Sequence, residues 1–226
     1  MEIRPSRIFP LGENALTVEF GDTLSEPLND AAIGLANYLT ENPFPGFVEA
    51  VPAIASTTIF YSCHVLTDKS AGPSAFEAVK SLVDRALGSV PAHPAASAKP
   101  IEVPVNFSDA DSPDLDFVAS TAGLAAAEVI EIFTSAVYRV FMLGFLPGFA
   151  YMGPVDERIA ASRRAAPRLA VPAGSVAIAG RQTGIYPAES PGGWQIIGRT
   201  TLPLLQPNGP SPCVFAPGDR VRFVRG

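Results

Sequence analysis

Glycine is concentrated in one third of this chain, and that concentration limits the folds open to it. Of the 19 glycines, 11 lie between Gly144 and Gly218. Short runs of β-forming residues occur in or beside this region, at 175–178, 194–197 and 220–224. Short strands joined by many tight turns are typical of β-barrels and β-sandwiches. We therefore predict a barrel or sandwich here, and the combined 42 glycines and prolines argue against an all-helical bundle.

The preceding residues predict a different kind of domain. Apolar residues alternate with polar ones over 16–20, and 54–61 is rich in β-branched residues, so both segments are predicted strands. Ser74 and Glu77 have the spacing of a capping box at the start of an amphipathic helix. We predict a small α+β domain over 1–90, a stiff Pro/Ala linker over 91–100 and a second domain over 101–226. The second domain should open with a strand at 101–105 and helices at 112–123 and 125–135.

Charge divides the chain as sharply as glycine does. Residues 1–143 carry 7 basic and 18 acidic side chains, whereas residues 144–226 carry 9 basic and 4 acidic ones, and all nine are arginines. The whole chain has a net charge of −6, which argues against a general nucleic-acid binder. Arginines among glycine-rich turns indicate a site for an anion such as a carboxylate or phosphate. The alternative is an ordinary solvated surface in which arginine is used for charge.

Several kinds of site are absent from the sequence. It has no phosphate-binding GxxxxGK[ST] loop, no GxGxxG after a strand and no HExxH zinc motif. Only Cys63 and Cys213 are present, which fits a reducing cytosol, and we predict no metal site. His64, at a predicted strand end, and His93, in the linker, have no nearby nucleophile, so a catalytic triad is not expected. No signal peptide or membrane-spanning run is recognisable, and we predict a cytoplasmic protein.

The segment 171–200 carries most of the candidate site. Its polar and aromatic residues lie between glycines and prolines, an arrangement that can bring donors and an aromatic wall to one cavity. The candidates for substrate or ATP binding are Arg181, Gln182, Thr183, Tyr186, Ser190, Trp194, Arg199 and Thr200. Arg181 and Arg199 could form an anion clamp or be exposed rim charges, and Trp194 could be a ligand wall or a core residue. Glu189 is the main general-base candidate and Asp219 the second, although each could be a loop or turn residue.

A second segment, 144–153, is rich in aromatic residues. Phe145, Pro147, Phe149 and Tyr151 alternate with small or turn-forming residues. This loop could line a pocket or dock on a partner protein, and packing within the core is the simpler alternative.

At these segments the chain resembles the family of the 5-oxoprolinase B subunit. That family is also called allophanate hydrolase subunit 1 and includes the Kip inhibitor of a sporulation histidine kinase. The matching strings are GFLPGFAY at 144–151, VPAGSVAIAG at 171–180, QTGIYP at 182–187, SPGGW at 190–194, IGRT at 197–200 and PGD at 217–219. Looser matches at 11–16 and 113–115 extend the likeness over the whole chain.

The resemblance implies an α+β N-terminal domain followed by a cyclophilin-like β-barrel C-terminal domain. It implies a protein that works with a related C subunit and a further A subunit and is inactive without them. The reaction would be the ATP-dependent opening of the 5-oxoproline lactam to glutamate. ATP would be a co-substrate whose site could be shared with a partner, with no tightly bound cofactor.

On this resemblance we assign Arg181 and Arg199 to anions, and we assign positioning of the substrate to Gln182, Thr183, Tyr186 and Ser190. Two alternatives are a protein that inhibits a sensor histidine kinase and a component of an allophanate-type amidohydrolase. The chain also departs from the family pattern. It has Phe107-Ser108-Asp109 in place of Tyr-Gly-Gly, and Phe133 in place of a histidine. Such changes would alter the substrate, or abolish catalysis while binding is retained.

Overall fold

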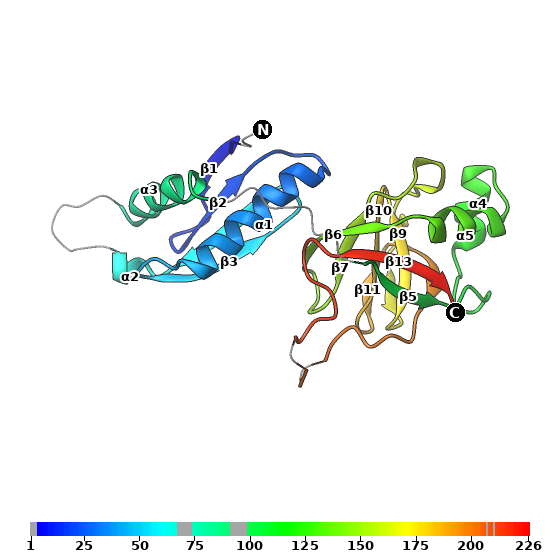
Figure 1. Cartoon of the computed structure of the whole chain (residues 1–226). Coiled ribbons are helices and arrows are strands. Elements are labelled where there is room, and N and C mark those ends of the chain that lie inside the picture. The colour runs from blue at the N-terminus through cyan, green and yellow to red at the C-terminus, as the bar shows by residue number, and fades with distance from the viewer. Residues whose placement is uncertain (1–3, 67–73, 91–98, 207, 210) are drawn as a thin grey trace. The chain divides into compact units, whose positions relative to one another are not determined.

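The computed structural model describes residues 4–66, 74–90, 99–206, 208–209 and 211–226 (Figure 1). It divides into two compact units, Met1–Ala95 and Ala96–Gly226. The division falls inside the segment 91–100, for which the sequence predicts a linker, but residues 91–98 lie outside the described residues.

The first unit is a four-stranded antiparallel sheet with helices, in the strand order β1-β2-β4-β3. Leu16 and Val18 on β2 and Ile59 and Tyr61 on β4 form its buried core together with the helices. The predicted strands at 16–20 and 54–61 are confirmed, with ends displaced by one or two residues. The strands are β1 (Arg7–Pro10), β2 (Ala15–Glu19), β3 (Phe47–Pro52) and β4 (Ser56–Tyr61), and the helices are α1 (Glu26–Glu41), α2 (Cys63–Leu66) and α3 (Ala75–Leu87).

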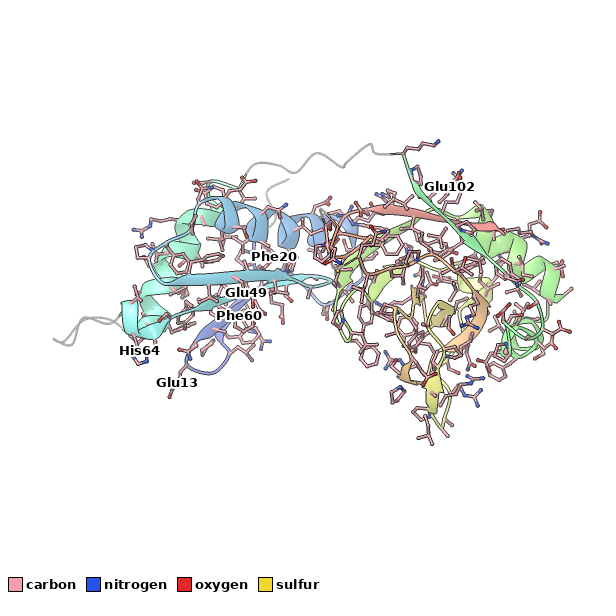
Figure 2. The ribbon with its side chains drawn as sticks, turned by 90° about the horizontal axis from the view of Figure 1, so that it is seen from below. Glu13, Phe20, Glu49, Phe60, His64 and Glu102 are labelled. Atoms are coloured by element: carbon pink, nitrogen blue, oxygen red, sulfur yellow. The ribbon has the colours of Figure 1, made fainter. Side chains whose placement is uncertain are left out.

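Local signals explain the start of α3. The Ser74 hydroxyl accepts a hydrogen bond from the Glu77 backbone N–H at 3.2 Å, and the Glu77 carboxylate accepts one from the Ser74 N–H at 3.0 Å. The predicted capping box is therefore confirmed. The prediction for His64 was wrong, because His64 lies in the short helix α2 and not at a strand end. Figure 2 shows it at the same end of the sheet as Glu13, where the Tyr61 N–H donates to the Asn14 carbonyl at 2.8 Å.

The second unit is a nearly closed barrel of seven strands in the order β12-β9-β10-β7-β6-β13-β5. Beyond β5, Asn106 exchanges two backbone hydrogen bonds with Arg199 on β12, at 2.7 and 2.9 Å, and so joins the two edges. Gly198 allows this approach, because a Cβ there would lie 2.5 Å from a Val105 methyl group. The strands are β5 (Ile101–Val105), β6 (Tyr138–Leu143), β7 (Ala150–Gly153), β9 (Ser175–Ala179), β10 (Gln182–Ile185), β12 (Gln195–Arg199) and β13 (Arg220–Arg225).

Helices α4 (Leu115–Ala122) and α5 (Ala126–Ser135) pack on the barrel (Figure 1). Gly123 ends α4 in the left-handed region, at φ 67°, as its position after the apolar run predicts. Phe133 on α5 is fully buried and stacks on Phe223 of β13, with ring centroids 4.7 Å apart. Within the described residues no single helix meets the length and hydropathy requirements for crossing a membrane, and α4 and α5 meet them only as a pair bent by 94°.

A smaller sheet stands beside the barrel. It pairs β8 (Arg168–Val171) with β11 (Ser190–Gly192), and a short 3-10 helix covers Glu157–Ile159. Around it lies a second apolar cluster that contains Phe149, Tyr186 and Trp194. This cluster and the barrel closure position the candidate site.

Candidate functional site

Two cavities in the second unit share one residue, Tyr186. The larger, of about 500 Å³, lies where β5 and β12 meet, and we call it the Arg199 cleft. The smaller, of about 310 Å³, is the aromatic pocket. The walls of the cleft include Asn106, Asp111, Gly174, Tyr186, Arg199 and Thr200. The walls of the aromatic pocket include Phe145, Phe149, Tyr151, Tyr186 and Trp194, with Arg163 and Arg164.

Backbone pairing at the barrel closure positions Arg199 in the cleft. Its Nε donates to the Ala173 carbonyl at 3.0 Å, which holds the guanidinium along the cleft wall. Gly174 faces it at φ 82°, and a Cβ there would overlap the Thr200 carbonyl oxygen, so only glycine fits. The Thr200 hydroxyl accepts from the Leu202 N–H at 3.1 Å, and its own proton has no acceptor among the described residues.

Asp111 is the carboxylate of the cleft, and the sequence reasoning missed it. The Asn106 side-chain amide and the Ser108 hydroxyl each donate to Oδ2 at 2.8 Å. The other oxygen, Oδ1, lies 4.0 Å from the Arg199 guanidinium. The two donors orient a partly exposed carboxylate toward the guanidinium of Arg199 in the cleft. One signal in the sequence could have pointed to Asp111. The chain has Phe107-Ser108-Asp109 in place of the Tyr-Gly-Gly of the family pattern, and Ser108 is one of the two donors to the Asp111 carboxylate.

Phe149 lies at the centre of the cluster of aromatic rings that lines the pocket. It is buried and meets four rings edge-on, with centroid distances of 5.7 Å to Phe145, 4.9 Å to Tyr151, 5.3 Å to Tyr186 and 5.5 Å to Trp194. Burial raises the pKa of the Tyr151 and Tyr186 phenols above the usual value of 10, although the nearby Arg163 charge acts in the opposite direction. Both phenols are therefore neutral hydrogen-bonding groups at neutral pH.

Phe145 occupies a backbone conformation that disfavours it. It has φ 71°, and the residue is 61% exposed. A bulky residue in the left-handed region stores on the order of 1 kcal/mol of strain, and such strain collects at functional sites. The conformation presents the Phe145 ring at the rim of the aromatic pocket.

A buried ion cluster adjoins the aromatic pocket, because Arg164 lines the pocket and also binds Asp114. Asp114, with a side chain only 4% exposed, accepts two hydrogen bonds from Arg168 at 2.8 Å and one from Arg164 at 2.9 Å. It also accepts the Ile196 backbone N–H at 2.7 Å. Sequence reasoning did not single out these residues, because Asp114 reads as an ordinary helix start and the arginines as part of a general positive charge.

The two arginines predicted to form a clamp are not brought together. Arg199 pairs with Ser175 at one end of β9, while Arg181 lies in the turn beyond Ala179 at the other end. Arg181 forms an exposed ion pair with Glu157 at 2.9 Å and lines neither cavity. At about 3.3 Å per residue, the length of β9 prevents both from holding one anion. The prediction that Arg181 and Arg199 clamp one anion together is therefore wrong. That either arginine binds an anion separately stays a prediction.

The predicted catalytic carboxylates lie outside both cavities. Glu189 is exposed between β10 and β11, and the Asp219 carboxylate accepts the Ala216 N–H at 2.8 Å, as a turn residue does. Nothing in the structure tests their roles in catalysis.

The remaining predicted residues are divided between pocket, interior and surface. Trp194 and Tyr186 form pocket walls, whereas the Thr183 hydroxyl is buried and donates to the Ala177 carbonyl at 2.9 Å. The Ser190 hydroxyl is buried and has no hydrogen-bond partner among the described residues. Gln182 and Pro147 line neither cavity.

The two departures from the family pattern differ in position. Phe107 lies against Gly198 beside the Arg199 cleft, with a ring carbon 3.2 Å from the position of a Cβ there. Phe133 lies in the core and lines neither cavity. The departure at 107–109 therefore changes the surroundings of the cleft, and the one at Phe133 changes core packing.

Comparisons with known proteins agree on one family. A family model described as carboxyltransferase domain, subdomain C and D, matches residues 6–215. The chain is 42% identical over 221 residues to the 5-oxoprolinase B subunit of Bacillus subtilis (strain 168), covering 97% of this chain and 92% of that protein. It is 37% identical over 219 residues to the 5-oxoprolinase B subunit of Escherichia coli O157:H7, covering 97% and 95%.

A solved structure extends the likeness to the fold. The crystal structure of TTHA0988 has a TM-score of 0.81 and 35% identity, covers 94% of this chain, and is longer, since this chain spans 40% of it. The two units of this chain together therefore have the fold of proteins with a carboxyltransferase domain, subdomain C and D. The chain belongs to this family, and within it to the family of the 5-oxoprolinase B subunit. The resemblance seen in the sequence is confirmed.

Proposed function

We propose that this chain is the B subunit of an ATP-dependent 5-oxoprolinase, which opens the lactam of 5-oxoproline to glutamate. The observation that carries the proposal is the similarity, over 97% of the chain, to two proteins of that name. Such a protein acts with others, and we propose a C subunit of related barrel fold and an A subunit, without which the chain is inactive. We also propose that the second unit is a cyclophilin-like barrel. The cytoplasmic location stays a prediction.

The proposed reaction activates an inert amide. Transfer of the γ-phosphoryl group of ATP to the amide oxygen releases ADP and makes the ring carbon electrophilic. Water then attacks that carbon, the C–N bond breaks with protonation of the nitrogen, and the resulting acyl phosphate is hydrolysed by a second water to glutamate and phosphate. A carboxylate that takes a proton from water and cations that stabilise developing negative charge would accelerate these steps.

The cleft supplies one candidate for each role. Arg199 and the Thr200 hydroxyl are donors for an anion, and Asp111 is a carboxylate oriented by two hydrogen bonds. We therefore place the proton acceptor at Asp111 in preference to Glu189, which lies outside the cavity.

The charge of the cleft bears on where ATP binds. Among the described lining residues Arg199 is the cation and Asp111 the acid, so their charges cancel. A triphosphate carries several negative charges and needs more positive charge than this wall offers. We propose that a partner protein of the complex completes the ATP site with additional cations.

The test is 5-oxoproline-dependent ATP hydrolysis by the complex isolated with a tagged chain, its partners identified by mass spectrometry. We expect Arg199→Ala and Asp111→Asn each to lower turnover about tenfold or more, and exposed Asp116→Asn to leave it unchanged. Loss of turnover in Glu189→Gln but not in Asp111→Asn would restore the first candidate for the base. A histidine kinase as the stoichiometric partner, with no turnover, would overturn the proposed function.

A further inference from the structure

The aromatic pocket combines apolar walls with uncompensated positive charge. Arg163 and Arg164 line it, and none of the described residues that line it is a carboxylate. Asp114, behind the wall, is shared by Arg164 and Arg168, so one negative charge faces two positive ones there. The pocket therefore differs from the Arg199 cleft, where one arginine faces one carboxylate. A cavity with such a charge favours an anionic ligand with an apolar body.

Arg163 is the cation best placed to meet such a ligand. Its guanidinium carbon lies 5.8 Å from the centre of the Trp194 ring, and it forms no ion pair with any described residue. Its charge also acts on both phenols of the pocket, Tyr151 and Tyr186. A second unmet donor lies nearby, because the Arg164 Nε is buried and has no acceptor among the described residues. The Arg163 guanidinium is therefore the accessible donor beside the aromatic rings.

We propose that the aromatic pocket binds a small ring that carries one carboxylate, with the rings of Phe145, Tyr151 and Trp194 against the ligand ring and Arg163 against its carboxylate. The inference deepens the proposed function and rests on it, because 5-oxoproline is a five-membered ring with a single carboxylate. The volume of about 310 Å³ lies at the lower end of ligand pockets, as a small metabolite requires. Tyr186 lines both this pocket and the Arg199 cleft, so a substrate bound here lies next to the cleft in which we place Asp111 and part of the ATP site.

Trp194 is the single tryptophan of the chain, so its fluorescence reports on this pocket directly. We would titrate the full chain with 5-oxoproline, with cyclopentanecarboxylate, which keeps ring and carboxylate but has no lactam, and with 2-pyrrolidinone, which keeps the lactam but has no carboxylate. We expect saturable changes for both acids, with Kd on the order of 1 mM for ligands of this size. The neutral lactam should bind about tenfold more weakly or worse, because it lacks the charge-assisted contact.

Two variants separate Arg163 from the rest of the pocket. Arg163→Gln should weaken binding of both acids about tenfold and leave the neutral lactam unchanged. The matched control is Arg222→Gln, an exposed arginine on β13 that lines neither cavity, which should bind like the unchanged chain. Phe145→Gly is a second variant that removes a wall residue at a backbone position that glycine prefers, so weaker binding without loss of stability is expected.

The outcomes distinguish the pocket from the proposed function. No saturable change of Trp194 fluorescence with either acid overturns the inference, and unchanged binding in Arg163→Gln overturns the role of that residue. A complex in which Arg163→Gln leaves the KM for 5-oxoproline unchanged also overturns the inference, while the proposed function stands. Saturable binding of both acids by a chain whose complex does not turn over 5-oxoproline supports the pocket and contradicts the proposed function.

Discussion

Removal of the Asp114 carboxylate should destabilise the second unit strongly. The carboxylate ties α4 to β8 through Arg168 and to β12 through the Ile196 N–H, and it also binds Arg164. In Asp114→Ala these donors lose their shared acceptor inside the protein. In Asp114→Asn one side-chain oxygen remains as an acceptor, so the loss is smaller.

The magnitude follows from burial. Removing one partner of a buried ion pair costs about 3–5 kcal/mol, because the other charge is left without compensation. Here the arginine side chains are 36% and 23% exposed, so water can hydrate part of both guanidiniums. We therefore expect the lower end, about 3 kcal/mol for alanine, and about 2 kcal/mol for asparagine.

Urea unfolding followed by Trp194 fluorescence measures this loss in the second unit alone. With a slope of about 2 kcal/mol per molar urea, Asp114→Ala should lower the midpoint by about 1.5 M. Asp116→Ala removes an exposed carboxylate from the same helix and should cost less than about 1 kcal/mol. Equal midpoints for the two variants would show that the buried cluster does not hold the unit together, and the reasoning would be refuted.

Two further predictions follow from buried tyrosines. A Cβ at Gly192 would overlap the Tyr186 hydroxyl, whereas at Gly193 it would lie 3.7 Å from its nearest neighbour, Pro167, so Gly192→Ala should abolish the 5-oxoproline fluorescence response and Gly193→Ala should keep it. Equal responses would show that Tyr186 need not stay in place. Burial raises the pKa of the Tyr138 phenol, which in the unfolded chain titrates near 10. Its contribution to stability is therefore complete below about pH 10 and is lost as the pH rises further. The urea midpoint should fall less between about pH 8 and pH 11 in Tyr138→Phe than in the unchanged chain. An equal fall in both would contradict the contribution assigned to the Tyr138 phenol.

Local patterns determined much of the fold. The capping box at Ser74, the left-handed stop at Gly123 and the short strands at 175–179, 195–199 and 220–225 followed from residues close together in the sequence. Such signals are readable because hydrogen-bond capping, side-chain periodicity and backbone preference act over a few residues. The family strings were also readable, because each is a run of consecutive residues.

Strand register and long-range pairing decided the site. Asp114 meets Arg164 and Arg168 across 50 and 54 positions, and Asp111 meets Arg199 only because the barrel closes between Asn106 and β12. The pairing of β9 placed Arg181 and Arg199 at opposite ends of one strand, although the sequence presented them as a matching pair. The residue types of the site could therefore be predicted from the sequence. Their contacts depend on which strands pair and in which register, and no local pattern carries that information.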